Sequence, residues 1–324
     1  MNAPVEVLID NRDGQLLELP VERFAWKTER KGAAGELNID FLLKPGTTAT
    51  VKEGAVIRVK VGQAKVFYGF VFRVSGNLTS KISVKAFDQL RYLKNKDTFV
   101  LKEMKASEAI TIIAKRMGCN IGSIEDTVHL QPARVEDETE AFDIILDYIS
   151  ISLTTQMRDY ILYDDFGKLT LRGMNKMAIP ITEFYIGDES LLTEAEWERS
   201  IEDAVNRVKL VQDNKETGKR EVYISQDSGN IAKWGLLQEF QKVDEKMKPP
   251  EIKETAEAIM RVKNRVSQTL KLSALGYWGV RAGRLTPVYI EQLGFKHHLM
   301  VESCTHTWER GVHKMDLEMK VFNI

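Results

Sequence analysis

The most organised group of side chains that could do chemistry lies near the C-terminus. A two-residue turn at Arg310-Gly311 would place these side chains on one face of a hairpin: Cys304, His306, Trp308, His313 and Met315. Two imidazoles and a thiol are ligands that Zn²⁺ accepts. Leu317 and Met319 continue the same face, which is typical of a core side with partly buried histidines. The pattern therefore favours a packed face, and we assign no metal site and no cofactor.

Paired carboxylates are a second source of chemistry, because hydrolysis of a glycan needs two of them flanking a groove. Two local groups occur, one around a turn and one before a strand: Asp159, Asp164 and Asp165, and Glu196, Glu198, Glu202 and Asp203. Neither spacing marks a catalytic pair. Both groups are expected to be solvated loops.

Nucleophile and nucleotide motifs are missing from the sequence. It contains no HExxH, GxSxG, P-loop or GxGxxG string. Cys119 follows Gly118 without an evident histidine partner, and the other cysteine, Cys304, is far away in the sequence and outside any CxxC pattern. A disulfide scaffold is excluded, and a single bridge is not expected. No catalytic residue is assigned, and the chain is predicted not to be an enzyme.

Two segments suggest binding functions. The segment 106–118 resembles the first helix of LysM domains, which bind peptidoglycan, but the strong apolar stripe of the following helix favours burial against neighbouring parts of the chain. A basic group lies close to Tyr92 and Phe99: Arg91, Lys94, Lys96 and Lys102. Such a group is more typical of a solvated helix end than of a surface that stacks bases.

Composition limits the classes of protein to which the chain could belong. The 324 residues are long enough for two or three domains, and 43% hydrophobic with 29% charged residues is typical of globular proteins. A formal net charge of -1 gives no global attraction to nucleic acid or anionic lipid. The N-terminus lacks a basic segment followed by an apolar core, and no run approaches the ~18–20 apolar residues of a membrane span. We expect synthesis in a cytoplasm and no membrane partner.

Residues 1–98 read as closely spaced strands. Alternating apolar residues predict strands at 5–9, 21–30, 36–43 and 56–61, followed by a hairpin over 66–86 that turns at Gly76-Asn77. Glycine or proline stands at the joints: Asp13-Gly14, Gly32, Gly35, Pro45-Gly46, Gly54 and Gly62. Asp88 is expected to cap a helical turn whose Leu90 and Leu93 face inward. This spacing favours a small barrel or sandwich over a parallel sheet, and we take residues 1–98 as a small antiparallel β-barrel domain.

Residues 99–180 change to a helical period. Ser107 precedes apolar residues at 110, 113, 114 and 117 and Gly118 follows them, which predicts one amphipathic helix. A second helix is predicted over 140–154, and strands at 159–163 and 168–172 flank a turn at 164–167. These residues form an α+β insertion.

Residues 181–324 return to strands. We predict them at 206–212 and 220–226 around a turn at 214–218, then at 271–275, 285–291, 298–308 and 312–322. Helices are predicted over 230–240 and 251–269, separated by Pro249-Pro250, so that the second β-barrel-like domain carries a helical segment over 230–269.

A faint internal echo links the two β regions. Residues 280–285 (VRAGRL) resemble residues 51–56 (VKEGAV), and a long hairpin follows each of them. This repetition favours two barrels of similar build. The predicted fold is therefore mainly β, with two small antiparallel barrel domains that flank and pack on the α+β insertion.

Three stretches carry a resemblance to a known family. Gly69–Phe72 with Ala86–Thr98, Asp227–Gln238 and His306–Met315 resemble the XkdQ/YqbQ-like baseplate hub proteins of contractile phage tails, which are distantly late control D-like. The likeness covers nearly the whole chain and is loosest in residues 1–50 and 174–200.

The resemblance implies a structural role. It implies a homotrimer, made in the bacterial host cytoplasm, that joins the sixfold tail tube to the threefold central spike in a phage or a phage-tail-like bacteriocin (tailocin) particle. Its partners would be the tube, spike, other baseplate proteins and the tape measure, without specific nucleic acid. The alternative is a peptidoglycan-binding or peptidoglycan-degrading tail protein.

Overall fold

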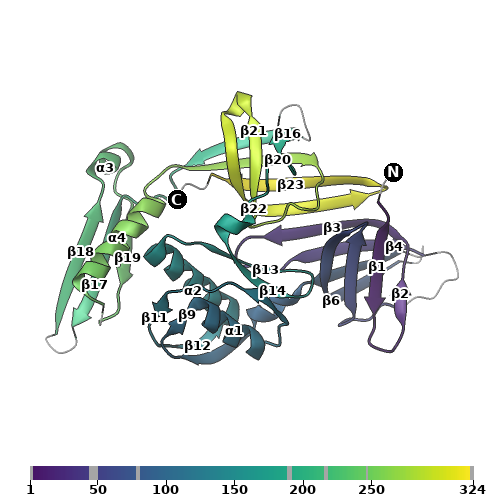
Figure 1. The fold of residues 1–324 in the computed structure, drawn as a ribbon, viewed down its shortest axis with the longest axis horizontal. Helices are drawn as coiled ribbons and strands as arrows, with labels where there is room; N and C mark the ends of the chain where they lie inside the picture. The colour runs from purple at the N-terminus through teal and green to yellow at the C-terminus, as the bar shows by residue number, and fades with distance from the viewer. Residues whose placement is uncertain are drawn as a thin grey trace.

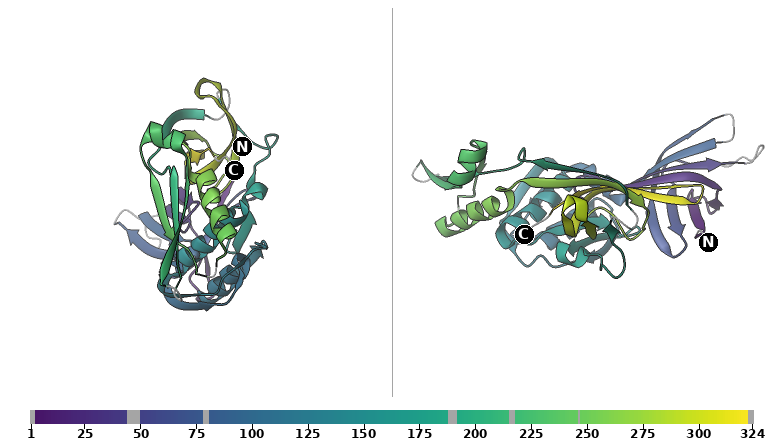
Figure 2. Two further views of the ribbon diagram at one scale, coloured as in Figure 1. Left: turned by 90° about the vertical axis from the view of Figure 1, so that its left-hand side faces the viewer. Right: turned by 90° about the horizontal axis from the view of Figure 1, so that it is seen from above.

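The computed structural model has three parts. It describes residues 3–43, 50–77, 81–187, 192–214, 218–245 and 247–321. Figure 1 shows the N-terminal strands at the right, the α+β part at the lower centre and the C-terminal strands at the top, with a smaller unit at the left end. The two further views in Figure 2 confirm that this smaller unit projects from the body. The predicted turns at Pro45-Gly46 and over residues 215–217 lie outside the described residues.

The N-terminal and C-terminal strands form one 13-stranded sheet. The N-terminal strand set contains β1 (Val5–Asp10), β2 (Leu16–Glu18), β3 (Val21–Glu29), β4 (Glu36–Leu42), β5 (Val56–Val61), β6 (Ala64–Gly76) and β7 (Lys81–Phe87). The C-terminal strand set contains β15 (Ile186–Gly187), β16 (Leu192–Ser200), β20 (Ser267–Leu275), β21 (Leu285–Ile290), β22 (Phe295–Glu309) and β23 (Val312–Lys320). A short helix, Glu291–Leu293, links β21 to β22.

Each strand set buries one face of its strands in a core of its own. In β3, Phe24 and Trp26 are buried and alternate with residues that are more exposed, as a half-buried strand requires. Leu270 and Leu272 of β20 do the same in the C-terminal set. The predicted mainly antiparallel β architecture is confirmed, whereas closure of either set into a barrel stays a prediction.

The two sets repeat the same strand order. The N-terminal order is β3-β4-β7-β6-β5-β1, and the C-terminal order is β16-β20-β23-β22-β21-β15. They differ in the last pair, because β1 runs antiparallel to β5 whereas β15 runs parallel to β21.

The sequence echo has a structural counterpart in two turns. The N–H of Gly54 donates to Val71 O at 2.7 Å, and the N–H of Gly283 donates to Val301 O at 2.8 Å. Both glycines have left-handed backbones, with φ of +80° and +87°, which a side chain would strain. The predicted echo is therefore confirmed at the level of backbone hydrogen bonds.

Irregularities in the strands repeat as well. The register against the partner strand shifts at two matched pairs of places. The shift between Val71 and Arg73 in β6 matches that between Val301 and Ser303 in β22. The shift between Val21 and Arg23 in β3 matches that between Leu192 and Glu194 in β16. Bulges fix register, so they allow the two sets to be aligned residue by residue. In this alignment Trp26 of β3, which pairs with Leu37, matches Trp197 of β16, which pairs with Leu270.

The α+β part forms a compact core of its own. It contains β8 (Lys96–Leu101), β9 (Met104–Lys105), α1 (Ala106–Arg116), β10 (Ile121–Ile124), β11 (Leu130–Gln131), β12 (Arg134–Glu140), α2 (Ala141–Gln156), β13 (Tyr160–Asp164) and β14 (Leu169–Gly173), with 3₁₀ helices at Gln89–Lys94 and Met174–Met177. Helices α1 and α2 appear as predicted. Asp88 caps the first 3₁₀ helix by accepting the N–H of Leu90 at 3.0 Å, as expected.

A smaller unit interrupts the C-terminal set between β16 and β20. It contains β17 (Arg207–Asn214), β18 (Lys219–Gln226), α3 (Ser228–Trp234), β19 (Gln238–Lys242) and α4 (Pro249–Lys263). The sheet order is β18-β17-β19, and α4 packs on it through Ile252 and Ile259. In the N-terminal set the corresponding connection, between β3 and β4, is a short loop.

Two helix predictions in this unit were wrong. The helix predicted over 230–240 ends at Trp234 because Gly235 takes a left-handed φ of +79°, and the following residues form β19 beside β17. Pro249-Pro250 does not separate two helices but starts α4. Proline is tolerated there because the backbone N–H groups of a first helical turn have no partner within the helix. The helix predicted to reach 269 ends at Lys263, because Ser267–Leu275 pairs with β16 and β23 instead.

Candidate functional site

Of the two histidines of the terminal hairpin, His306 lies in the core and His313 is half-buried beside it. His306 is fully buried, and Trp26 stacks on its ring with centroids 5.3 Å apart. His306 Nε2 lies 2.8 Å from the oxygen of Val280, and Nδ1 lies 2.9 Å from His313 Nε2. Because a carbonyl oxygen only accepts, Nε2 of His306 carries the proton and Nδ1 accepts from His313.

This arrangement pairs both ring nitrogens of His306 with protein groups. Burial lowers the pKa of His306 to about 4 and that of His313 to about 3, so both rings are neutral near pH 7. Cys304 is buried, its Sγ lies 3.2 Å from His306 Nε2, and burial raises its thiol pKa. The predicted core-facing side is confirmed, and the described residues contain no group of three such side chains arranged to hold a metal.

The aspartates around the β13–β14 turn are mostly buried, so the prediction of a solvated loop was wrong for two of them. Asp159 and Asp164 are 4% and 6% exposed, whereas Asp165 is exposed. Asp164 accepts the N–H of Gly167 at 2.7 Å and the side-chain amide of Gln89 at 2.6 Å. Sequence spacing could not reveal this burial, because the groups that cover the turn come from distant parts of the chain.

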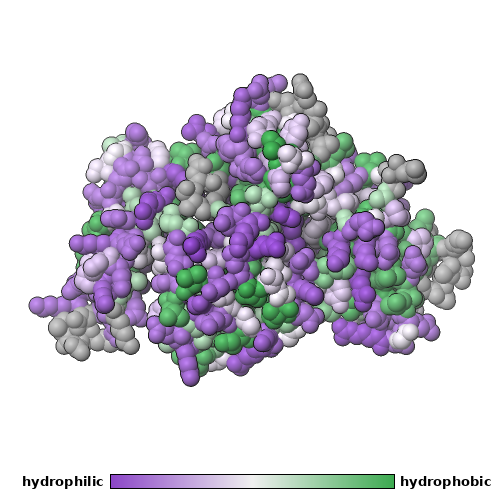
Figure 3. Space-filling view, in the orientation of Figure 1, coloured by the Kyte–Doolittle hydropathy of each residue, from purple (hydrophilic) through white to green (hydrophobic). Residues whose placement is uncertain are grey.

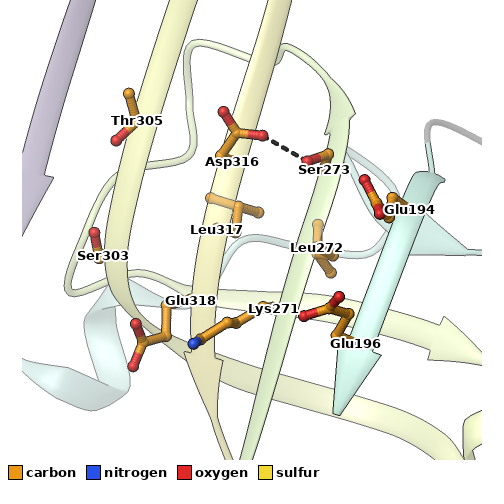
Figure 4. A pocket seen from close by; sticks show the side chains of 10 residues that line it. All are labelled: Glu194, Glu196, Lys271, Leu272, Ser273, Ser303, Thr305, Asp316, Leu317 and Glu318. Carbon is orange, nitrogen blue, oxygen red and sulfur yellow. Dashed lines mark hydrogen bonds between the residues drawn. The ribbon is translucent and has the colours of Figure 1, made fainter.

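The second acidic group is exposed, as predicted, but the prediction of a loop was wrong for Glu196 and Glu198, which lie in a strand. Glu196 and Glu198 stand on the outer face of β16, and Glu202 and Asp203 lie in the turn that follows. A shallow hollow of about 340 Å³ lies on this face. In Figure 4 the side chain of Lys271 of β20 points towards Glu318 of β23, and Glu196 lies on the other side of Lys271. The hollow is lined by Glu194, Glu196, Lys271, Leu272, Ser273, Ser303, Thr305, Asp316, Leu317 and Glu318. Carboxylates outnumber lysines here, which makes the centre of the face acidic.

The remaining candidates have structural roles. Cys119 is buried, and its pKa is raised to about 11 by burial, so it is a poor nucleophile. Phe99 is 1% exposed and cannot stack on a base, although Lys94, Lys96 and Lys102 near it are exposed. In the segment that resembles LysM, the inner residues of α1, such as Ile110 and Ile113, share a core with α2.

A buried polar junction joins all three parts of the chain. Arg281, in the turn before β21, donates from Nη1 to the backbone oxygen of Asp164 at 2.7 Å. Its guanidinium lies over the ring of Tyr163, 4.6 Å from the centroid, and 5.8 Å from that of Trp26. The C-terminal set, the α+β part and the N-terminal set therefore meet at one cation.

The surroundings of the junction raise the pKa values of two of its carboxyl groups, those of Asp88 and Asp164. Asp88 accepts the N–H of Gly35 at 2.8 Å. Burial, reinforced by the nearby Asp164, raises the pKa of Asp88 to about 8, and burial also raises the pKa of Asp164. Arg281 opposes both shifts, so the junction depends on this cation.

A second group of ion pairs, centred on Arg30, also joins the three parts of the chain. Arg30 donates from Nε to Glu302 at 2.9 Å and from Nη1 to Asp159 at 3.1 Å, and its side chain is 9% exposed. Sequence reasoning missed both groups, since their members are separated by up to 272 positions. They fix the relative positions of the three parts.

Open strand edges and apolar side chains mark the outer surface. Strand β16 is an edge strand of the large sheet, and its Trp197 is 57% exposed. Val100 of β8 and Val135 of β12 face each other and are 74% and 65% exposed. Figure 3 shows hydrophobic side chains among hydrophilic ones over the lower part of the molecule, where α1 and β12 lie. No helix in the described part is both long and apolar enough to cross a membrane.

The architecture is that of phage tail proteins. The crystal structure of the prophage MuSo2 43 kDa tail protein from Shewanella oneidensis matches with a TM-score of 0.70 at 11% identity, over 98% of this chain and 97% of that one. A tail protein from Neisseria meningitidis MC58 matches with a TM-score of 0.69 at 13% identity, over 99% and 96% of the two chains. At these low identities, the TM-scores show a shared fold and no more.

Sequence comparison identifies the family. The model of the YQBQ-like family matches residues 24–320, and the chain belongs to that family. The phage-like element PBSX protein XkdQ of Bacillus subtilis (strain 168) is 27% identical over 315 residues, which is 95% of this chain and 94% of that protein. The resemblance drawn from the sequence is thereby confirmed.

Proposed function

We propose that the chain is a structural baseplate hub protein of a contractile phage tail or a phage-tail-like bacteriocin. Three copies would connect the sixfold tail tube to the threefold central spike. The observation that carries the proposal is the duplication: two strand sets share one order and one register within a chain whose fold is that of tail proteins. Three copies would present six similar units.

Symmetry gives the duplication a purpose. A ring of six similar units can stack on a sixfold tube, while the unlike parts of each chain keep threefold symmetry on the other side. The inserted β17–β19 unit has no counterpart in the N-terminal set, so it breaks the sixfold likeness once per chain. In this proposal residues 1–98, 99–180 and 181–324 act as the domains, and each β domain closes into a barrel.

The role is mechanical rather than enzymatic in this proposal. The buried ion pairs of Arg30 and the junction at Arg281 hold the three parts together as one body. The partners are the tube protein, the spike, other baseplate proteins and the tape measure, and the site of action is the tail baseplate of the particle.

The native mass of the purified chain tests this function. We expect a mass near three chains by light scattering over a concentration series, either alone or after addition of the tube and spike proteins of the same particle. A chain that stays monomeric with both partners and instead binds purified cell wall would refute the hub and support the peptidoglycan-binding alternative. A matched measurement with Ile112→Ala, an exposed position on α1, shows whether wall binding uses that helix.

A further inference from the structure

Strand β22 already joins the two strand sets within one chain. Its first half pairs with β21, and its second half pairs antiparallel with β3. In this pairing Ser303 lies opposite Glu29, and His306 lies opposite Trp26. The N–H of Arg30 extends it by donating to Glu302 O at 2.8 Å. The long strand of one set therefore pairs with the first strand of the other.

The duplication provides a second pair of such strands. Strand β6 matches β22 through the bulge at residues 71–73, and β16 matches β3 through the bulge at residues 192–194. Strand β6 pairs with β5 only as far as Phe70, and β16 pairs with β20 along one side. Among the described residues, the outer edges of β6 beyond Phe70 and of β16 carry no strand. They correspond to the edges of β22 and β3 that form the internal contact.

We propose that β6 of one copy pairs antiparallel with β16 of a second copy, in the register of the internal β22–β3 contact. Transfer of that register places Arg73 opposite Ser200, Ser75 opposite Glu198, and Gly76 opposite Trp197. This inference rests on the proposed hub function and names the contact that would close its ring. A contact between two different surfaces of the same chain can be repeated from copy to copy around an axis. It gives a closed ring when the last copy meets the first.

The exposure of the matched tryptophans supports this contact. Trp26 is 6% exposed, because β22 covers it, whereas Trp197 at the same register position is 57% exposed. A tryptophan on an open strand edge fits a surface that another chain covers, because open edges pair readily and tryptophan is enriched at interfaces. Gly76, its proposed opposite, has no side chain and leaves room for the indole.

The surrounding side chains fit the same register. Arg73 is exposed on the outer face of β6, and Glu198 is exposed on the outer face of β16, so the transferred register puts opposite charges on neighbouring diagonal positions. In the proposed contact, Ile201 stands at the position of Arg30 and Phe72 at the position of Glu302, the two residues of the internal ion pair. Phe72 is 38% exposed. An apolar pair would thus replace a buried ion pair at the same place.

Disulfide trapping between two differently tagged copies tests the register. One copy carries Arg73→Cys and the other Ser200→Cys, and the mixture is oxidised under conditions in which the native mass exceeds one chain. Directly opposite residues of antiparallel strands are ~4.5–5.5 Å apart at Cα, within reach of a disulfide. A mixed ring of three copies contains one contact between the two cysteines, so we expect a band of two chains that contains both tags, beside the band of the unlinked copies, on a non-reducing gel.

Two matched controls frame the result. Ser303→Cys with Glu29→Cys in a single chain reproduces the internal contact and must form its bond. Arg73→Cys mixed with Glu196→Cys is offset by four residues, roughly 13 Å along the strand, and must not cross-link. An assembled protein in which the Ser200 partner gives no more product than the offset partner overturns the contact and leaves the proposed hub standing. A chain that never exceeds monomer mass with its partners overturns both.

A substitution gives an independent readout. Trp197→Lys changes an exposed side chain and is expected to shift the mass of the assembly to that of one chain while the folded monomer persists. Val222→Lys on β18, also 49% exposed on an open edge, serves as the matched control and should leave the mass unchanged. Assembly of the Trp197→Lys variant at wild-type concentrations would overturn the proposal.

Discussion

Removal of the junction cation is the sharpest test of how the three parts are held together. Arg281→Met keeps the apolar stem beside Tyr163 and Trp26 but removes the positive charge from Asp88 and Asp164. It also leaves the backbone oxygen of Asp164 without the 2.7 Å hydrogen bond. Removing one partner of a buried charged group typically costs about 3–5 kcal/mol. We expect a loss of about 3 kcal/mol in the free energy of unfolding at pH 8, since methionine retains most of the packing.

The pH dependence gives the test a second arm. Burial raises the pKa of Asp88 to about 8 and also raises that of Asp164, so the folded state binds protons more tightly than the unfolded state between pH 4 and 8. Without Arg281 these pKa values rise further. Lowering the pH neutralises the carboxylates and therefore reduces the cost of the substitution. The loss measured at pH 5 should be clearly smaller than the loss at pH 8.

Urea unfolding followed by tryptophan fluorescence measures both values. Arg261→Met on α4 is the control, because Arg261 is exposed and the two residues have similar helix propensities. Its effect should stay within about 0.5 kcal/mol. A loss below about 1 kcal/mol for Arg281→Met at pH 8, or a loss that is the same at both pH values, would show that the cation does not balance these carboxylates.

Three further predictions concern the cores and the turns. Below about pH 6.5 His306 binds a proton in the unfolded state, whereas the buried ring of the folded state stays neutral down to about pH 4. The free energy of unfolding should therefore fall by ~1.4 kcal/mol per pH unit for this residue between pH 6.5 and 4, measured in urea titrations at stepped pH. Ile113→Ala in α1 should lose about 2–5 kcal/mol by leaving a cavity, whereas Ile112→Ala, at a position 46% exposed, should lose less than about 1 kcal/mol; equal losses would contradict the assigned helix face. Gly283→Ala should lower the melting temperature more than Gly54→Ala, because both positions have positive φ but only a Cβ at Gly283 meets Ile161, at 2.4 Å; the reverse order would refute the clash.

Local patterns were enough to predict most elements. The β6–β7 hairpin and helix α1 each follow from an apolar period, and Asp88 was recognised as a cap before its buried surroundings were known. Strand β12, by contrast, has the sequence RVEDETE with almost no apolar alternation. It exists because it pairs with β8, which is a tertiary contact that no local period reports.

The candidate site was less predictable than the fold. The face of His306 and Met315 was recognised as core because a strand period of two determines which side chains share a face. Asp159 and Asp164 were mistaken for solvated residues, because their burial depends on groups such as Arg30 and Arg281 that lie more than a hundred positions away. Loop composition carries no information about such partners.

The sequence by itself determined most of the elements, their antiparallel pairing within each hairpin, the family and the first sign of duplication in the segments around Gly54 and Gly283. These properties follow from hydrogen bonding and side-chain periods over a few residues. Only the tertiary structure decided that β22 joins β3, and that Trp197 is left exposed where Trp26 is covered. Strand edges pair through backbone groups that every residue possesses, so the choice of partner depends on the packing of the whole chain.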